Sequence, residues 1–255
     1  MPNSRTRTLL QVVCLIAVAH VQAAENAAPA DGKPDPAKLF TDYNAVTFRN
    51  LESARQRIKL DQVDFDLLSA AAFHETNQRR QKEGRPALQH DQRVREAAQL
   101  QATIMAERGS ISHLNPELPD KKTPEDRLRL KGLNPAFAAE NVATAFALTY
   151  TEGEPVYVRE ENGQKVFSRE SKGAPLESHT YLSFAEALLD GWMASPNHRA
   201  NIVAAEAKYL GVSSRPGTDR MGMPIFFCAQ VFYTSLPAGA GPVIRAPDSV
   251  SDQGQ

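Results

Sequence analysis

The hydrophobic pattern of this chain predicts four or five helices with recognisable ends. Apolar residues recur every three or four positions in four stretches, which places them on one face of a helix. The first three stretches begin at residues that can cap a helix and stop at a glycine. They run from Asp64 or Asp66 to Gly84, from Asp91 to Gly109, and from Thr123 to Gly132. We therefore expect amphipathic helices that share a core.

The fourth stretch contains Trp192 and leads into Ser195-Pro196-Asn197-His198. Pro196 disfavours helical geometry at Ser195, so we expect the helix to end there. Ser195 is then placed to cap a new helix with Pro196 at its first position. His198 would lie in the first turn, where the positive end of the helix dipole favours a neutral imidazole. Such an imidazole can bind a metal or accept a proton, or it can serve only to pack at a helix junction.

Strands are expected in the second half of the chain. A β-hairpin is predicted over residues 155–169, because apolar residues flank Asn162-Gly163, which is a strong two-residue turn sequence. Two further strands are predicted over residues 208–214 and 223–233, with turn residues at 216–219 between them. The second of these is apolar enough to be a central strand buried on both faces.

A polar pair interrupts one short apolar stretch. Glu140 and Asn141 lie between alanines and a valine in residues 139–143. Burying such groups without partners costs a few kcal/mol, roughly 1–3 in proteins. We therefore expect partners for both inside the protein.

The composition indicates a globular, exported protein. The chain has 255 residues, of which 42% are hydrophobic and 23% charged. Arg5 and Arg7, the apolar segment after them and Val21-Gln22-Ala23 predict a signal peptide over residues 1–23 that is cleaved near Ala23. No other stretch is long and apolar enough for a transmembrane segment in the mature chain. We expect the protein to be periplasmic or extracellular.

Cleavage at that site changes the balance of charge and cysteine. The remaining chain has 27 basic and 30 acidic residues, a net charge of −3, which excludes the basic footprint of a protein that binds nucleic acid. Cys14 is removed and Cys228 is left, so no internal disulfide can form. We expect Cys228 to be buried and unreactive, because its neighbours are apolar.

The chain divides into five segments after these observations are combined. Residues 1–23 are the signal peptide, 24–38 read as a linker, and 39–65 as a helical N-terminal extension. The main domain spans 66–235, with an insert at about 150–178 that contains the hairpin. Residues 236–255 are expected to form a disordered tail.

Several motifs occur along the main domain in a distinctive order. They are Asn77 and Arg80, His113, Glu125-Asp126-Arg127-Leu128, Ala139-Glu140-Asn141-Val142-Ala143, Trp192-x-x-Ser195-Pro196-x-His198-Arg199-x-Asn201-Ile202, Leu210-Gly211-Val212 and Gln230-Val231-Phe232. This order resembles the CAP superfamily (cysteine-rich secretory proteins, antigen 5 and pathogenesis-related-1 proteins, also called the SCP domain), in its bacterial, cysteine-poor branch. The resemblance implies an α+β fold, a three-layer α-β-α sandwich with a small, mostly antiparallel sheet between helices.

The resemblance also implies a cleft lined by two histidines and two glutamates, sometimes with a divalent metal. On this chain the histidines fall on His113 and His198, the first glutamate on Glu140, and the second on Ser195. Those four residues are the predicted ligand cleft. His113, His198 and Glu140 could hold zinc with a water in the fourth position, or they could form a hydrogen-bonded cluster without a metal.

Three functions remain open from the sequence. The first is an exported, non-enzymatic module whose cleft binds a small or lipid-like ligand, as the resemblance implies for some members. The second is a hydrolase, either metal-assisted through His113, Glu140 and His198, or serine-based through Ser195 with a histidine as base. The third is docking of the hairpin or of residues 39–60 onto an envelope or extracellular protein.

Other motif residues are expected to have structural roles. Trp192 is predicted to lie in the core. Asn77, Arg80 and Asn201 are predicted to satisfy backbone groups or ion pairs around the cleft, and Arg199 to pair with an acid that the sequence does not identify.

Overall fold

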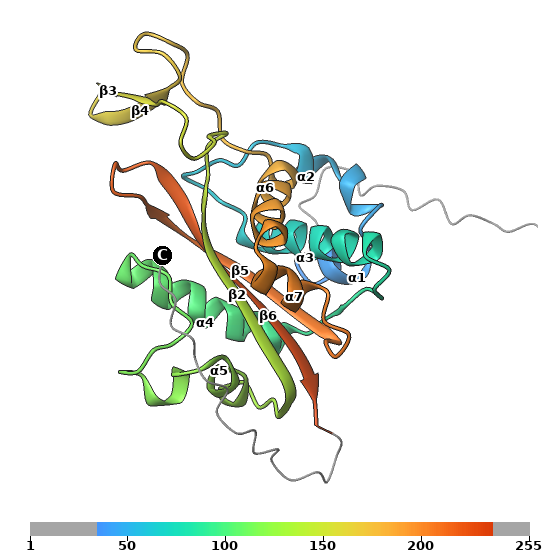
Figure 1. Ribbon diagram of the computed structural model, residues 1–255. Coiled ribbons are helices and arrows are strands. Elements are labelled where there is room, and N and C mark those ends of the chain that lie inside the picture. Colours follow the sequence, from blue (N-terminus) through green and yellow to red (C-terminus); the bar gives the residue numbers. More distant parts are fainter. Residues whose placement is uncertain (1–34, 237–255) are drawn as a thin grey trace, which may run out of the picture. The chain divides into compact units, whose positions relative to one another are not determined.

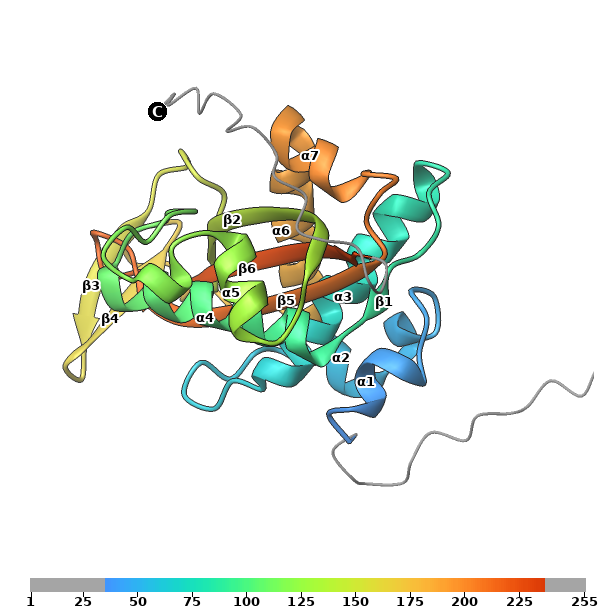
Figure 2. The same ribbon diagram turned by 90° about the horizontal axis from the view of Figure 1, so that it is seen from below.

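The computed structural model describes residues 35–236. The predicted signal peptide, most of the predicted linker and nearly all of the predicted tail lie outside the described residues. Within them, a four-stranded sheet lies between two layers of helices (Figures 1 and 2). The predicted α+β sandwich is thereby confirmed.

The sheet has the strand order β1-β5-β6-β2. Its strands are β1 (Gln89–His90), β2 (Pro135–Phe146), β5 (Tyr209–Thr218) and β6 (Pro224–Ser235). β2, β6 and β5 are antiparallel neighbours, whereas the two-residue β1 runs parallel to β5. The sheet is therefore mostly antiparallel, and β1 and β2 form its two edges.

Different helices cover the two faces of the sheet (Figure 1). On one side are α1 (Lys38–Thr41), η1 (Phe48–Asn50), α2 (Glu52–Arg55), α3 (Phe65–Lys82), α6 (Tyr181–Ala194) and α7 (Pro196–Ile202). On the other are α4 (Gln92–Arg108), η2 (Pro119–Lys121) and α5 (Pro124–Leu130). Figure 2 shows α7 beside the β2 edge and α1 beside β1.

β6 joins the two cores because its side chains alternate between the faces of the sheet. Phe226, Cys228 and Phe232 belong to the cluster with α3 and α6, whereas Phe227 and Val231 belong to the cluster with α4 and α5. This central strand is buried on both sides, as its apolar sequence predicts. Cys228 is fully buried, and burial raises the pKa of its thiol to about 12, which leaves it unreactive.

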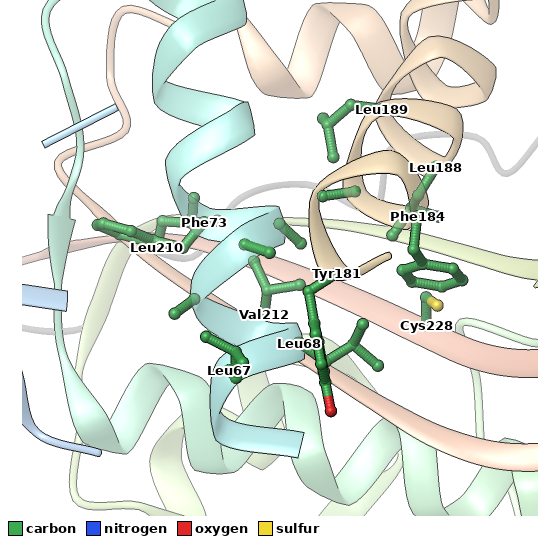
Figure 3. Packing of buried hydrophobic residues seen from close by; sticks show 14 of the residues in the cluster. Leu67, Leu68, Phe73, Tyr181, Phe184, Leu188, Leu189, Leu210, Val212 and Cys228 are labelled. Atoms are coloured by element: carbon green, nitrogen blue, oxygen red, sulfur yellow. The ribbon is translucent and has the colours of Figure 1, made fainter. Parts of the chain in front are cut away.

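The larger core lies between α3, α6 and the sheet. Figure 3 shows side chains of the two helices meeting above β5 and β6. Leu67 and Leu68 of α3 pack there with Phe184 and Leu188 of α6. Trp192 is buried in the same cluster, as predicted. Apolar residues of the N-terminal extension are part of it too: Leu39, Phe40, Phe48, Ala54 and Ile58.

Local capping signals set the helix boundaries. Asp64 caps α3 by accepting hydrogen bonds from the backbone N–H groups of Asp66 and Leu67. Thr123 and Asp126 form a capping box at the start of α5. Gly109 ends α4 at φ 67°, in the left-handed region that glycine adopts without strain. These predicted boundaries are confirmed.

The turn predicted at residues 216–219 is wrong, because β5 continues to Thr218. The N–H of Asp219 donates to the carbonyl of Met223, so the alternation of the ladder turns the nitrogen of Pro216 away from β6. A proline there removes no ladder hydrogen bond. The turn lies after Asp219, whose carboxylate accepts hydrogen bonds from the N–H groups of Met221 and Met223.

The predicted hairpin is present as β3 (Tyr157–Glu161) and β4 (Gln164–Ser168). Asn162 and Gly163 both have positive φ, at 52° and 75°, as the tight turn requires. Phe167 anchors the hairpin in a small cluster with Leu148 and Met223.

Gly211 in β5 explains the Leu-Gly-Val motif. A Cβ atom at this position would lie 2.2 Å from the backbone nitrogen of Arg95 in α4. Helix and strand therefore pack as closely as they do because residue 211 has no side chain. Among residues 35–236 there is no helix of the length and apolarity needed to cross a membrane.

Candidate functional site

The side chain of Glu140, the predicted cleft glutamate, is buried and bonded to two neighbouring side chains. Nδ1 of His113 lies 3.0 Å from Oε1 of Glu140, and Arg127 donates from Nη2 to Oε2 at 2.6 Å. The Glu140 side chain is 1% exposed and that of Arg127 is fully buried, whereas that of His113 is 48% exposed. A carboxylate oxygen accepts hydrogen bonds, so Nδ1 of His113 is the donor in this contact. Only the imidazole of this trio is open to solvent.

Arg127 also fixes the loop that carries His113. Nη1 donates to the backbone carbonyls of Lys121 at 3.0 Å and of His113 at 3.3 Å. The capping box of α5 sets the direction of the helix that carries Arg127. The position of the imidazole is therefore determined by both its side-chain and its backbone contacts.

Asn141 points to the opposite face of β2, toward α7. Its Nδ2 donates to the carbonyl of His198 at 3.2 Å and to Oε1 of Gln230 at 2.9 Å. Its Oδ1 accepts from Nδ2 of Asn201, and Gln230 in turn donates to the hydroxyl of Thr76. This amide chain links α7, β2, β6 and α3. The expectation that Glu140 and Asn141 have internal partners is confirmed.

The two cleft histidines approach each other around the β2 edge. His113 reaches this edge from the α5 side and His198 from α7. Burial lowers the pKa of His198, and the nearby His113 lowers it further. The neutral form that the sequence favours for His198 is therefore supported by burial and by a second imidazole.

Ser195 differs from its expected role. It occupies the N-cap position of α7, yet its hydroxyl makes no capping hydrogen bond. Pro196 at the first position fixes φ and needs no donor, so the backbone alone starts this short helix. Within residues 35–236 no hydrogen bond joins the Ser195 hydroxyl to an imidazole. The hydroxyl is therefore not activated by a base in this arrangement.

The arrangement of His113, His198 and Glu140 does not fit the predicted zinc site. Both carboxylate oxygens of Glu140 are already engaged, one by Arg127. In the part of the chain that the structure describes, no group of three or more His, Cys, Asp or Glu side chains is placed to hold a metal ion. A metal bound at Oε1 of Glu140 would displace the hydrogen bond from His113, because Oε2 is occupied by Arg127.

Two other motif residues satisfy backbone groups, as predicted, but Asn77 does so beside β1 and not around the cleft. Asn77 donates to the carbonyl of Leu88 and accepts from its N–H. Arg80 donates to the carbonyls of Pro86, Ile202 and Ala204.

The remaining two roles are also resolved. Asn201 donates to the carbonyl of Glu140 at 3.3 Å, so it supports the backbone of the β2 edge. Arg199 pairs with Glu83 at 2.6 Å, which identifies the acid that the sequence did not.

Sequence reasoning missed the role of Arg127, which completes the cluster. The residue was recognised within Glu125-Asp126-Arg127-Leu128 but given no function. Its position beside the buried Leu128 in a short amphipathic helix is the available signal, since a buried arginine requires hydrogen-bond acceptors around it. The hydrogen bonds of Gln230 with Asn141 and Thr76 were also not predicted, because these residues are far apart in the sequence.

The sequence matches the model of a known protein family. The model of the cysteine-rich secretory protein family, CAP, matches residues 73–232. No protein with a curated description matches the chain.

Three solved bacterial structures are similar at low identity. An extracellular protein containing an SCP domain from Bacillus anthracis is 22% identical over 69% of this chain and 43% of its own, with a TM-score of 0.46. An outer surface protein from Borrelia burgdorferi is 15% identical over 64% of this chain and 90% of its own, with a TM-score of 0.39. A cysteine-rich secretory protein from Staphylococcus aureus is 13% identical over 67% and 40%, with a TM-score of 0.36. The chain thus spans less than half the length of the Bacillus protein.

Proposed function

The chain belongs to the cysteine-rich secretory protein (CAP) family, and we propose that it is an exported binding module rather than an enzyme. Its ligand site is the β2 edge around His113, Glu140, Ser195 and His198. The ligand is a small or lipid-like molecule that the two imidazoles contact through hydrogen bonds. Export rests on the signal peptide predicted over residues 1–23.

One observation carries this proposal: each carboxylate oxygen of Glu140 already accepts a hydrogen bond from a neighbouring side chain. A general base or a metal ligand needs a carboxylate that can release or accept a partner during the reaction. Glu140 instead bonds a fully buried arginine on one oxygen and His113 on the other. Its role in this proposal is to orient the His113 ring, which then presents a fixed hydrogen-bonding edge to a ligand.

The serine-type hydrolase is the second candidate, because a histidine oriented by a carboxylate is half of a catalytic triad. The other half is a serine hydroxyl within hydrogen-bond reach of that histidine. Ser195 has no such bond, and the chain has no Gly-x-Ser-x-Gly elbow. This candidate predicts turnover that depends on both Ser195 and a histidine.

Docking of residues 39–60 onto a partner is less favoured than a cleft ligand. The large apolar residues of this segment are already buried against α3 and α6. Tyr157 and Val158 of the hairpin are exposed, so the hairpin remains the segment for partner docking within this proposal.

The test uses the mature chain, residues 24–255, and a His113→Ala/His198→Ala double variant. Each is incubated with bacterial total lipid extract and examined by native mass spectrometry. We expect a bound lipid species on the wild type that is lost from the double variant, together with equal background rates on p-nitrophenyl butyrate and fluorescent casein. Lipid binding that ignores both histidines would contradict the proposed site.

A zinc-binding measurement distinguishes the binding module from the metal-assisted hydrolase. Calorimetry with Zn²⁺ is expected to show no stoichiometric binding to the wild type. Micromolar or tighter zinc binding that disappears in the double variant, or turnover that disappears in Ser195→Ala, would replace the binding module by a hydrolase.

A further inference from the structure

A groove lies at the opposite edge of the sheet from the two cleft histidines. It has a volume of about 890 Å³ and runs between residues 40–47, the C-terminal half of α3, and residues 85–90, which include β1. We call it the β1 groove. None of the four cleft residues lines it. Residues 40–47 precede residue 73, where the family match begins, so one wall belongs to this chain's own N-terminal extension.

The floor of the β1 groove is a set of stacked rings. Phe40 stacks on His90 with ring centroids 3.9 Å apart, and Phe73 meets the edges of His74 and His90 at 5.2 and 5.8 Å. Tyr43 also lines the groove. Burial lowers the pKa of both His74 and His90 to about 4, so the rings are uncharged at neutral pH. The floor is therefore an uncharged aromatic surface, in which the Phe40 and His90 rings are nearly parallel and the Phe73 ring stands at 87° to that of His90.

One polar atom of this floor lacks a partner. Nδ1 of His90 is buried without a hydrogen bond from any described residue. Nε2 of His74, by contrast, is bonded to the carbonyl of Leu39 at 2.8 Å. Buried polar atoms are nearly always satisfied, so this nitrogen is an exception at the floor of the groove.

The rim of the groove carries a single permanent charge. Arg85 is exposed, and its guanidinium forms no ion pair within residues 35–236. The other lining residues include no Asp, Glu or Lys. A guanidinium recognises carboxylate, phosphate or sulfonate groups through paired hydrogen bonds. Its charge therefore selects an anion over a neutral or cationic ligand.

We propose that the β1 groove binds a small organic anion with a flat, apolar body. The body lies on the rings of Phe40, Tyr43 and His90, and the anionic group pairs with Arg85. An apolar surface with a few convergent polar groups is the usual composition of a small-molecule site. This site is separate from the predicted ligand site at the β2 edge.

The test uses 1-anilinonaphthalene-8-sulfonate, which has a flat aromatic body and one sulfonate, at pH 7 with the mature chain. Fluorescence and calorimetry are expected to give saturable binding of one molecule per chain. The uncharged analogue N-phenyl-1-naphthylamine is expected to bind more weakly. Loss of the paired charge in Arg85→Gln should weaken sulfonate binding by about tenfold and leave the uncharged analogue unaffected.

Two further variants make the result specific to the groove. Ala87 is exposed and lines the groove, so Ala87→Trp should fill it and abolish binding without disturbing the core. Arg220→Gln removes an equally exposed arginine from the turn between β5 and β6 and should leave binding unchanged. Circular dichroism checks that each variant is folded.

The outcomes either support or overturn the proposal. Absence of saturable binding, or equal binding by wild type, Arg85→Gln and Ala87→Trp, would overturn it. The His113→Ala/His198→Ala double variant should bind the probe as wild type does. Failure of the β2 cleft as a ligand site is therefore distinguishable from failure of the β1 groove.

Discussion

The two edges of the sheet each hold a pair of histidines, in opposite chemical surroundings. At the β2 edge His113 bonds a carboxylate and is half exposed, and His198 lies beside a chain of amides. At the β1 edge His74 and His90 are packed among phenyl rings. The imidazole is the same group at both edges, so its neighbours decide whether it serves as an oriented polar contact or as an uncharged aromatic ring.

An asparagine also acts at each edge, again with different partners. Asn77 bonds both the N–H and the carbonyl of Leu88, just as a neighbouring strand would, and so closes the sheet beside β1. Asn141 bonds other side chains and one carbonyl, and so joins elements across the sheet. The β2 edge therefore depends on a connected polar network, and the β1 edge on packing with a few isolated hydrogen bonds.

The largest effect that tests this difference is the loss of Glu140. Glu140→Leu would leave the buried guanidinium of Arg127 without its charge partner. We expect the free energy of unfolding to fall by about 3–5 kcal/mol in urea titrations at pH 7. The double variant Glu140→Leu/Arg127→Met removes both charges and should recover much of that loss. A single-variant loss below about 1 kcal/mol would show that the β2 network is not held by this ion pair.

The next effect is the loss of stability at acid pH that the histidines of the β1 edge cause. The pKa of His74 is about 4 in the folded protein because of burial, against an ordinary value of 6.5. Between these values the unfolded chain binds the proton and the folded protein does not, so stability falls as the pH falls from 6.5 to 4 and levels off below. His74 contributes up to about 3 kcal/mol to this loss. His90 contributes less, because it is partly exposed.

Urea titrations between pH 7 and 4 measure this slope. Carboxylates also titrate in this range, so the informative quantity is the difference between wild type and His74→Leu. We expect a smaller loss of stability in the variant over this interval. Equal slopes would mean that the folded protein already accommodates a charged His74.

Local signals in the sequence predicted much of the fold. The caps at Asp64 and Thr123 and the turn at Asn162-Gly163 each depend on a few neighbouring residues, and all three are confirmed. The strands β1 and β2, which pair with segments distant in the sequence, were not predicted. β1 has only two residues, and the twelve residues of β2 are rich in alanine, which gives no strong strand pattern. Both are stabilised by neighbours that are distant in sequence.

The candidate site was predicted by resemblance and only in part. His113 and Glu140 do meet, but the partner that engages the second oxygen of Glu140, Arg127, was not foreseen. The β1 groove was not foreseen at all. Its walls come from residues 40–47 and 85–90, which meet only when the N-terminal extension packs on α3. Whether the β2 cleft binds a ligand stays a prediction.

A smaller loss of stability is expected when Asn77, the asparagine at the β1 edge, is replaced. Asn77→Ala would leave the N–H and carbonyl of the buried Leu88 without their partner. We expect a loss of about 2 kcal/mol in stability and faster hydrogen exchange at the Leu88 amide. Asn77→Asp keeps an acceptor for the N–H but buries a carboxylate whose second oxygen faces the Leu88 carbonyl, so it should be at least as destabilised as Asn77→Ala. Unchanged exchange at Leu88 would show that Asn77 does not close this edge.

The smallest effect tests whether the two edges communicate through the surface. Arg199 of α7 pairs with Glu83, which follows α3 near the β1 groove, and both side chains are at least one-third exposed. Solvent screens such a pair, so Arg199→Ala should change stability by less than about 1 kcal/mol, and the change should shrink further in high salt. A double-mutant cycle with Glu83→Ala measures the coupling directly. Coupling well above 1 kcal/mol would mean that the edges are linked by this surface pair. Weak coupling would leave the link to buried Arg80, whose hydrogen bonds already join Pro86 beside the groove to Ile202 and Ala204 at the end of α7.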